Sequence, residues 1–395
     1  MNRHHTYESR EPISADQPAE KNTGTTRREF LLTLGAGLTA ALDSGKRAAA
    51  AELIEDFLNK DAEGMEPKIE LEIFFAPHAT REDATGLKER IRASDIYIPE
   101  IFGWDERVLV LYRAIAQGKI GPEGYFKELG ASSQEIQEIK KTLEYTETEI
   151  LYNSGKRVEF IDLPDTNRIY SQLDKEITEP KFRGKENASE VISAYKQNAH
   201  KIVLLQKERE LYMLEQLAEL QKKIAAGEIQ ELKGRSTVKI LIFLGAYHTE
   251  FLHRLHRKGK KVLRSSPTFY VYRHNEEMMR CFAFGKEITD DLAAKSILEI
   301  LMDSFLSDKL DEVTRSSHER NMLERAAAEK FSTDEIKDLI EQILQGASIQ
   351  TVRETLLKKL REKGVESFAV LKQKIKPRKN SLTKPDEITP KNLHD

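Results

Sequence analysis

Two histidines in this chain follow apolar segments in the same local order. Leu71-Glu-Ile-Phe-Phe-Ala-Pro-His78 and Leu241-Ile-Phe-Leu-Gly-Ala-Tyr-His248 each run from a strand-like segment through a short turn to a histidine, and a helical pattern follows. In a parallel sheet, side chains just beyond the carboxyl ends of the strands meet at one edge, where ligands bind. An imidazole at that edge can bind a metal ion or transfer protons near neutral pH. The repeated pattern therefore predicts a site that contains His78 and His248.

Acidic and basic side chains elsewhere in the chain extend this candidate site. Glu100 ends the second predicted strand, so it should open onto the same edge. In the long helix that follows, Glu210 falls inside the apolar arc of the helical wheel, and Arg209 lies at the edge of that arc. A carboxylate on an apolar face needs a cation or hydrogen-bond donors, because unpaired burial is costly. A functional site and a structural ion pair both satisfy this requirement.

The elements that must position these residues alternate along the chain. Apolar segments predict strands at 69–75, 95–101, 157–163 and 238–244, and helical patterns occupy 80–91, 132–153, 189–226 and 249–258. The segments 268–273 and 279–284 also suggest a hairpin. Strands separated by helices favour a mainly parallel sheet covered by helices. The fold class expected is therefore α/β, followed by an all-helical C-terminal segment.

The domain organisation follows from changes in pattern. We expect a signal region at 1–51, an α/β domain at 65–288, a helical segment at 289–375 and a disordered tail at 376–395. Ser332-Thr-Asp-Glu335 is a capping box that starts one of the C-terminal helices, and Gly346 ends it. The tail carries three prolines and no apolar periodicity, which is typical of disorder.

Net charge and cysteine content give no sign of a nucleic-acid-binding protein and rule out a disulfide within the chain. The 395 residues carry a net charge of −3, which gives no reason to expect a nucleic-acid partner. The single cysteine, Cys281, cannot form a disulfide within the chain, and its apolar neighbours suggest a small core residue.

The N-terminal region has the layout of an export signal. Thr26-Arg27-Arg28-Glu29-Phe30-Leu31 precedes a weakly apolar run to Leu42, and then come Lys46-Arg47 and the four alanines 48–51. The paired arginines are similar to the twin-arginine signature, which would make the translocase of folded proteins a partner during export. This predicts a periplasmic or extracytoplasmic protein, tethered to the membrane if the signal is not cleaved. The alternative is an amphipathic surface helix that begins with two arginines.

These motifs occur in the order seen in one known family. The first histidine strand, the segment ending Ile-Pro-Glu100, the helix with Glu208-Arg209-Glu210, and Gly245-Ala-Tyr-His248 together resemble the TraB/GumN family, which includes pheromone-shutdown proteins and the Tiki peptidases. The resemblance covers roughly residues 68–262. The family has two Gly-x-x-His motifs; the second is intact here, whereas Phe75 stands where the first glycine would be.

The resemblance implies a metal-dependent hydrolase, in the Tiki branch a peptidase. Carried over by position, His78, His248 and Glu100 would be metal ligands, with Glu100 as the alternative base. Arg209 would orient a carboxylate or stabilise an oxyanion, and Glu210 would hold Arg209 or a ligand in place. Imidazole and carboxylate together suit manganese, cobalt or zinc without selecting among them.

Three hypotheses for function remain open at this point. The first is an exported hydrolase acting on a peptide or a small molecule. The second is a protein that binds a metal, haem or small ligand without turnover. The third is an interaction protein in which residues 289–375 dock a protein partner and the α/β part is a scaffold.

Overall fold

The computed structural model describes residues 67–76, 81–178, 184–245, 248–257, 262–266 and 272–375. The predicted signal region at 1–51, His78 and the predicted tail at 376–395 lie outside these ranges.

A five-stranded sheet forms the centre of the α/β part. Its strands are β1 (Lys68–Ala76), β2 (Ile96–Ile98), β3 (Arg157–Val158), β4 (Thr237–Gly245) and β5 (Val262–Ser265). The order across the sheet is β3-β2-β4-β1-β5, and every pairing is parallel. The predicted α/β class with a mainly parallel sheet and a helical C-terminal segment is confirmed.

The sheet is buried on both faces because its long strands alternate between two cores. On one face Ile73, Phe75 and Ile242 pack with α9 (Ala188–Ala225) and α10 (Thr249–Arg257). On the other face Phe74 and Phe243 pack with α3 (Leu87–Ala93), α4 (Glu106–Ala116), α5 (Pro122–Glu128), α6 (Ser133–Ile139) and α7 (Leu143–Leu151). Near-continuous apolar sequence is what a parallel strand covered on both sides requires.

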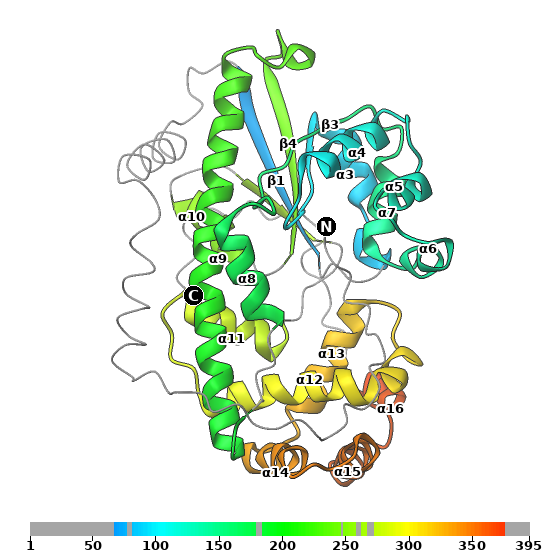
Figure 1. The fold of residues 1–395 in the computed structure, drawn as a ribbon, viewed down its shortest axis with the longest axis vertical. Coiled ribbons are helices and arrows are strands. Elements are labelled where there is room, and N and C mark those ends of the chain that lie inside the picture. The colour runs from blue at the N-terminus through cyan, green and yellow to red at the C-terminus, as the bar shows by residue number, and fades with distance from the viewer. Residues whose placement is uncertain are drawn as a thin grey trace, which may run out of the picture.

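The helix α9 joins the α/β part to the helical part. Its 38 residues begin at an Asn187 cap and end at Ala225. The second half of α9 packs on the sheet through Met213, Leu214 and Leu217. The first half packs through Val191 and Ile192 in a separate core, which it shares with the C-terminal helices. Figure 1 shows α9 running beside β4, with the C-terminal helices gathered around its other end. The core between α9 and the sheet and the core of the C-terminal helices therefore share the helix α9.

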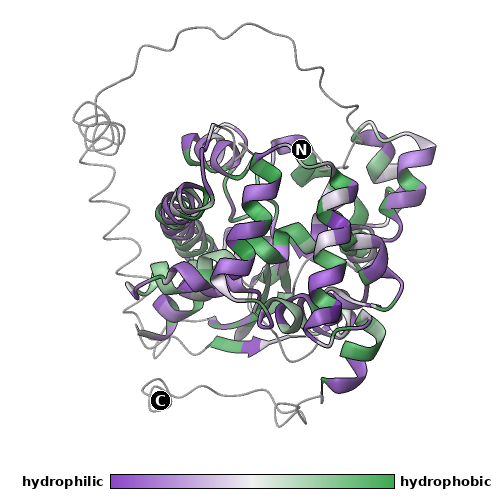
Figure 2. Cartoon of the chain, turned by 90° about the horizontal axis from the view of Figure 1, so that it is seen from below, coloured by the Kyte–Doolittle hydropathy of each residue, from purple (hydrophilic) through white to green (hydrophobic). Residues whose placement is uncertain are grey.

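The C-terminal helices are α11 (His274–Ala283), α12 (Asp290–Asp311), α13 (Ser317–Ala328), α14 (Thr333–Leu344), α15 (Ile349–Glu362) and α16 (Phe368–Lys374). They pack around α12, which contacts α11, α13, α14 and α15. The predicted capping box at Ser332 and Glu335 starts α14. Figure 2 shows apolar and polar residues interleaved along these helices, as expected where one side of each faces a core. Within the described ranges, no helix is long and apolar enough to cross a membrane.

The structure corrects several local predictions. The predicted hairpin at 268–273 and 279–284 is wrong, because 274–283 form the helix α11. The predicted helix at 132–153 is two helices, since α6 ends at Ile139 and Thr142 caps α7. The strands predicted at 95–101 and 157–163 are shorter in the structure, where only three and two residues, respectively, pair with a neighbouring strand. Residues 99–101, Glu100 among them, and 159–163 lie beyond the carboxyl ends of β2 and β3.

Candidate functional site

Glu100 and His248 meet at the carboxyl edge of the sheet. β2 and β4 are hydrogen-bonded neighbours, Glu100 follows β2 by two residues, and His248 follows β4 by three. Glu100 Oε1 lies 3.1 Å from His248 Nε2, and Glu100 Oε2 accepts a hydrogen bond from the Gly245 amide. Parallel pairing brings these two residues together although 148 positions separate them in the sequence.

The helix α9 supplies the other side of this cluster. Arg209 Nη2 donates to Glu100 Oε1 at 2.9 Å. The amide nitrogen Nε2 of Gln206 lies 3.1 Å from His248 Nδ1, and Glu210 Oε1 lies 3.5 Å from the same ring nitrogen. Both nitrogens of the imidazole therefore face side chains of the cluster. Arg209 and Glu210, selected from the sequence, lie on either side of the Glu100–His248 pair.

The family resemblance gives Glu210 two alternative roles, to hold Arg209 in place or to hold a metal ligand in place. The contacts of Glu210 do not fit the first role. In the described part of the chain, Arg209 pairs with Asp162 and Glu100, while Glu210 is paired only with His248. Both carboxylate oxygens of Glu210 are buried and have no hydrogen-bond partner among the described residues. A buried carboxylate in this condition is costly unless a cation or donor reaches it.

Asp162 is a member of the cluster that sequence reasoning missed. Its Oδ1 accepts a 2.7 Å hydrogen bond from Arg209 Nε, and its Oδ2 accepts a second from Nη2. Asp162 lies four residues beyond β3, so it occupies the same edge of the sheet as Glu100. The rule that selected Glu100, an acid near the end of a predicted strand, would also have selected Asp162 in the segment 157–163.

The cluster is largely buried, although the Glu100 side chain is 17% exposed, and burial shapes its electrostatics. His248 is 0% exposed, Asp162 and Glu210 are each 1% exposed, and Arg209 is 7% exposed. Burial alone would lower the pKa of His248. The charge of Glu100, the hydrogen bond to Glu100 and the 3.5 Å contact with Glu210 outweigh both that effect and the repulsion of Arg209, and the pKa rises to about 9. Burial also opposes the charge of Arg209, but Asp162 and Glu100 raise its pKa well above the usual value.

The first histidine motif can be described only up to its strand. Phe75, at the position of the missing glycine, lies in β1 opposite Leu244 of β4 and is 2% exposed in the core. Because its backbone is part of a regular parallel ladder, that position does not require glycine. Ala76 pairs with Gly245, so β1 and β4 end side by side at the edge where Glu100 and His248 lie. The place of His78 itself lies outside the described residues.

Glu100 and His248, two of the three residues that the sequence predicts as metal ligands, are among the described residues. Among them, no group of three or more histidine, cysteine, aspartate or glutamate side chains is arranged to hold a metal ion. Glu100 and His248 Nε2 form an imidazole–carboxylate pair, and the other ring nitrogen of His248 is oriented by Gln206 and Glu210. The Glu210 carboxylate beside Nδ1 is the kind of acceptor that usually orients a metal-ligating histidine. The pair therefore fits a divalent ion that takes its remaining ligands from elsewhere.

The segment after Glu100 packs against the cluster. The Phe102 ring lies over the Arg209 guanidinium, with 4.7 Å between Cζ and the ring centroid. Trp104 Nε1 donates to the carbonyl oxygen of Asp162 at 2.7 Å. In the structure it supports the backbone of Asp162.

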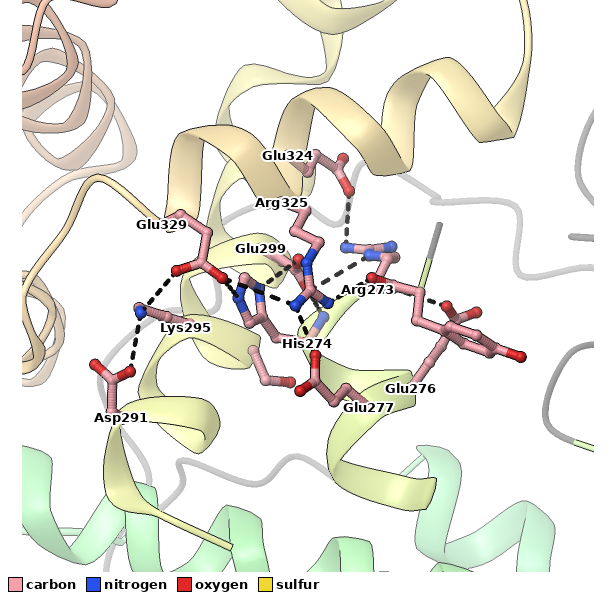
Figure 3. A network of polar contacts seen from close by, with 12 residues as sticks. Arg273, His274, Glu276, Glu277, Asp291, Lys295, Glu299, Glu324, Arg325 and Glu329 are labelled. Carbon is pink, nitrogen blue, oxygen red and sulfur yellow. Dashed lines mark hydrogen bonds and ion pairs between the residues drawn. The ribbon is translucent and has the colours of Figure 1, made fainter. Parts of the chain in front are cut away.

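A second group of buried charges lies in the helical part (Figure 3). His274 Nδ1 lies 2.8 Å from Glu299, and its Nε2 lies 2.9 Å from Glu329. Arg273 Nη2 lies 3.0 Å from Glu324, whose pKa burial raises to about 7. These pairs join α11, α12 and α13 to one another. Because each charge has a partner of opposite sign, the group serves to connect helices.

Comparisons of the chain with protein-family models, with curated proteins and with solved structures give no match. The resemblance to the TraB/GumN family therefore rests on the motifs alone.

Proposed function

We propose that this chain is a metal-dependent hydrolase whose centre contains His248 and Glu100. The observation that carries the proposal is the charge of the cluster. Two carboxylates, Asp162 and Glu100, pair with one guanidinium, and a third carboxylate, Glu210, lies beside the imidazole of His248. A divalent cation at His248 Nε2, bound in place of the imidazole proton, would balance this excess of acidic groups.

Each residue of the cluster then has a defined task. His248 and Glu100 would hold the ion, with His78 as the further ligand that the sequence predicts at the neighbouring strand end. Arg209 and the Gly245 amide hold the two oxygens of Glu100, which fixes the direction of its carboxylate. Gln206 and Glu210 orient the imidazole. When bound, the ion would acidify a water molecule and polarise a carbonyl group, which is the chemistry that hydrolysis needs.

The proposal extends to location and substrate as the sequence suggests them. Export through the twin-arginine route would place the enzyme in the periplasm or another extracytoplasmic space. Peptides or small esters and amides would be its substrates. Manganese, cobalt and zinc are the candidate ions.

The deciding measurement is metal content by elemental mass spectrometry of purified protein reconstituted with each of the three ions. We expect wild-type protein to retain about one ion per chain, and His248→Ala and His78→Ala to lose it. His200→Ala is the matched control, because His200 is exposed on α9 and stacks on Phe282 away from the cluster. A wild type that retains no ion after reconstitution with all three would refute the proposal.

A ligand-binding protein without turnover is the second candidate. It is favoured by the nearly complete burial of Arg209 and His248, since a hydrolase must admit both substrate and water. The two candidates differ in their response to a panel of peptides and esters. Hydrolysis that requires the metal and is lost in Glu100→Gln supports the enzyme. Metal retention without hydrolysis of any substrate supports the binding protein.

A docking role for residues 289–375 has less support. Within the described residues, Leu298, Leu323 and Ile340 of these helices share a core with the first half of α9. The helical segment is therefore part of the structure that positions Gln206 and Arg209.

A further inference from the structure

Asp162 engages Arg209 more fully than any other described residue does. It accepts hydrogen bonds from both Nε and Nη2 of the guanidinium, a bidentate geometry that fixes the plane of the group. Its Oδ1 also accepts the Leu163 amide at 2.7 Å, which fixes the carboxylate in turn. Asp162 is 1% exposed, so its charge acts on Arg209 with little screening by solvent.

The same guanidinium also holds Glu100. Arg209 Nη2 donates both to Glu100 Oε1 and to Asp162 Oδ2, so one nitrogen serves two carboxylates. If Glu100 were the only acid at Arg209, a buried one-to-one ion pair would cancel the charge of Glu100. With Asp162 present, the positive charge is already balanced, and Glu100 keeps negative charge directed at His248 Nε2.

The loops after β2 and β3 are tied together around these acids. Gly103 donates its amide hydrogen to the Leu163 carbonyl at 2.9 Å, and Asp165 donates to the Trp104 carbonyl at 2.9 Å. Trp104 Nε1 donates to the Asp162 carbonyl, and the Phe102 ring covers Arg209. The segment that begins with Glu100 therefore also positions Asp162, and hydrogen bonds join the loops that carry the two carboxylates.

We infer that Asp162 is a positioning residue, which locks the fork of Arg209 and neutralises it so that Glu100 retains its charge for a divalent cation. This inference rests on the proposed function, because it names what makes Glu100 a competent ligand. It assigns a role to Asp162 in the loop after β3. It also explains how Arg209 can be buried next to a site that binds a cation.

The test is cobalt binding by calorimetry at pH 7 for full-length wild type and four variants. Asp162→Asn keeps the size and the acceptor oxygen but removes the charge. Asp165→Asn is the matched control, since Asp165 is three residues away and exposed. Asp162→Asn combined with Arg209→Gln removes both charges of the pair. His248→Ala removes the ligand.

We expect Asp162→Asn to bind cobalt about 10- to 100-fold more weakly than wild type, the range for losing an outer-shell partner. Asp165→Asn should bind as wild type does. The double variant should bind more tightly than Asp162→Asn alone, because the uncompensated guanidinium is gone. A purely structural role for Asp162 predicts the opposite order, with the double variant weakest. That order, or equal binding by Asp162→Asn and wild type, would overturn the inference while the proposed function stands.

A metal-free readout separates the inference from the proposed function. The Arg209 Nε proton donates to Asp162 in a buried position, so its nuclear magnetic resonance signal should be protected from exchange with water. Asp162→Asn should shift and deprotect this signal, and Asp165→Asn should not. If wild type binds none of manganese, cobalt and zinc, the proposed function fails and this signal decides the positioning of Arg209. An unchanged signal in Asp162→Asn would then refute that positioning as well.

Discussion

Glu147 gives a prediction whose size can be worked out from the structure. This residue of α7 is 5% exposed beneath the sheet, and the Tyr97 hydroxyl donates to its Oε1 at 2.8 Å. Burial raises the pKa of Glu147 from 4.5 to about 8. The Tyr97 hydrogen bond opposes that rise, and the charges of Glu144 and Glu100 add to it. Glu147 is therefore mostly protonated in the folded protein at pH 7 and mostly ionised in the unfolded chain.

The sign of the effect on stability follows from linkage. Because the folded pKa lies above the unfolded one, the contribution of Glu147 to stability is fully present below pH 4.5 and is lost as the pH rises toward 8. Each pH unit in that window costs about 1.4 kcal/mol, so the loss is about 1 kcal/mol at pH 5 and about 3 kcal/mol at pH 7. Glu147→Gln keeps an acceptor for Tyr97 and does not titrate. We expect it to be more stable than wild type, by about 2 kcal/mol more at pH 7 than at pH 5.

The assay is urea unfolding followed by circular dichroism at pH 5, 6 and 7. Glu138→Gln is the control, because Glu138 is an exposed acid of the neighbouring helix α6 that pairs only with Lys141 among the described residues. Its effect should stay within about 0.5 kcal/mol at every pH. A difference between Glu147→Gln and wild type that does not change with pH would refute the reasoning.

Three further predictions concern the supports of the candidate site. Gly103→Ala should be destabilised more than Gly130→Ala in thermal unfolding. Both glycines have positive φ, but of the two only Gly103 has the Tyr170 ring where the added Cβ would lie. Equal losses of thermal stability would contradict this. Trp104 is the one tryptophan of the chain and donates to Asp162, so cobalt should quench its fluorescence in wild type but not in His248→Ala. Deleting residues 289–395 should leave an aggregating or unfolded protein by circular dichroism, because it exposes the apolar face of α9 around Val191 and Ile192; a soluble, folded remainder would show that the α/β part is independent.

Much of the fold could be read from the sequence because its signals are local. The apolar run at 238–244 favours a strand buried on both faces, and it is β4. The long periodic segment gave α9 to within one residue at each end, and the capping box predicted at Ser332 starts α14. The hairpin prediction failed because Met279–Phe284 is apolar but short, and such a run does not distinguish a strand from a buried helix.

The sequence by itself determined which residue types end which strands, and hence that Glu100 and His248 would face one edge of a parallel sheet. Only the tertiary structure decided the strand order, which makes β2 and β4 neighbours and brings Glu100 to His248. It also decided the rotation of α9, which sends Arg209 toward Asp162 and Glu210 toward His248. The physical reason is that strand and helix patterns are set by neighbours a few residues apart. Pairing of charges between residues far apart in the sequence depends on which surfaces pack together, and apolar packing carries no label for its partner.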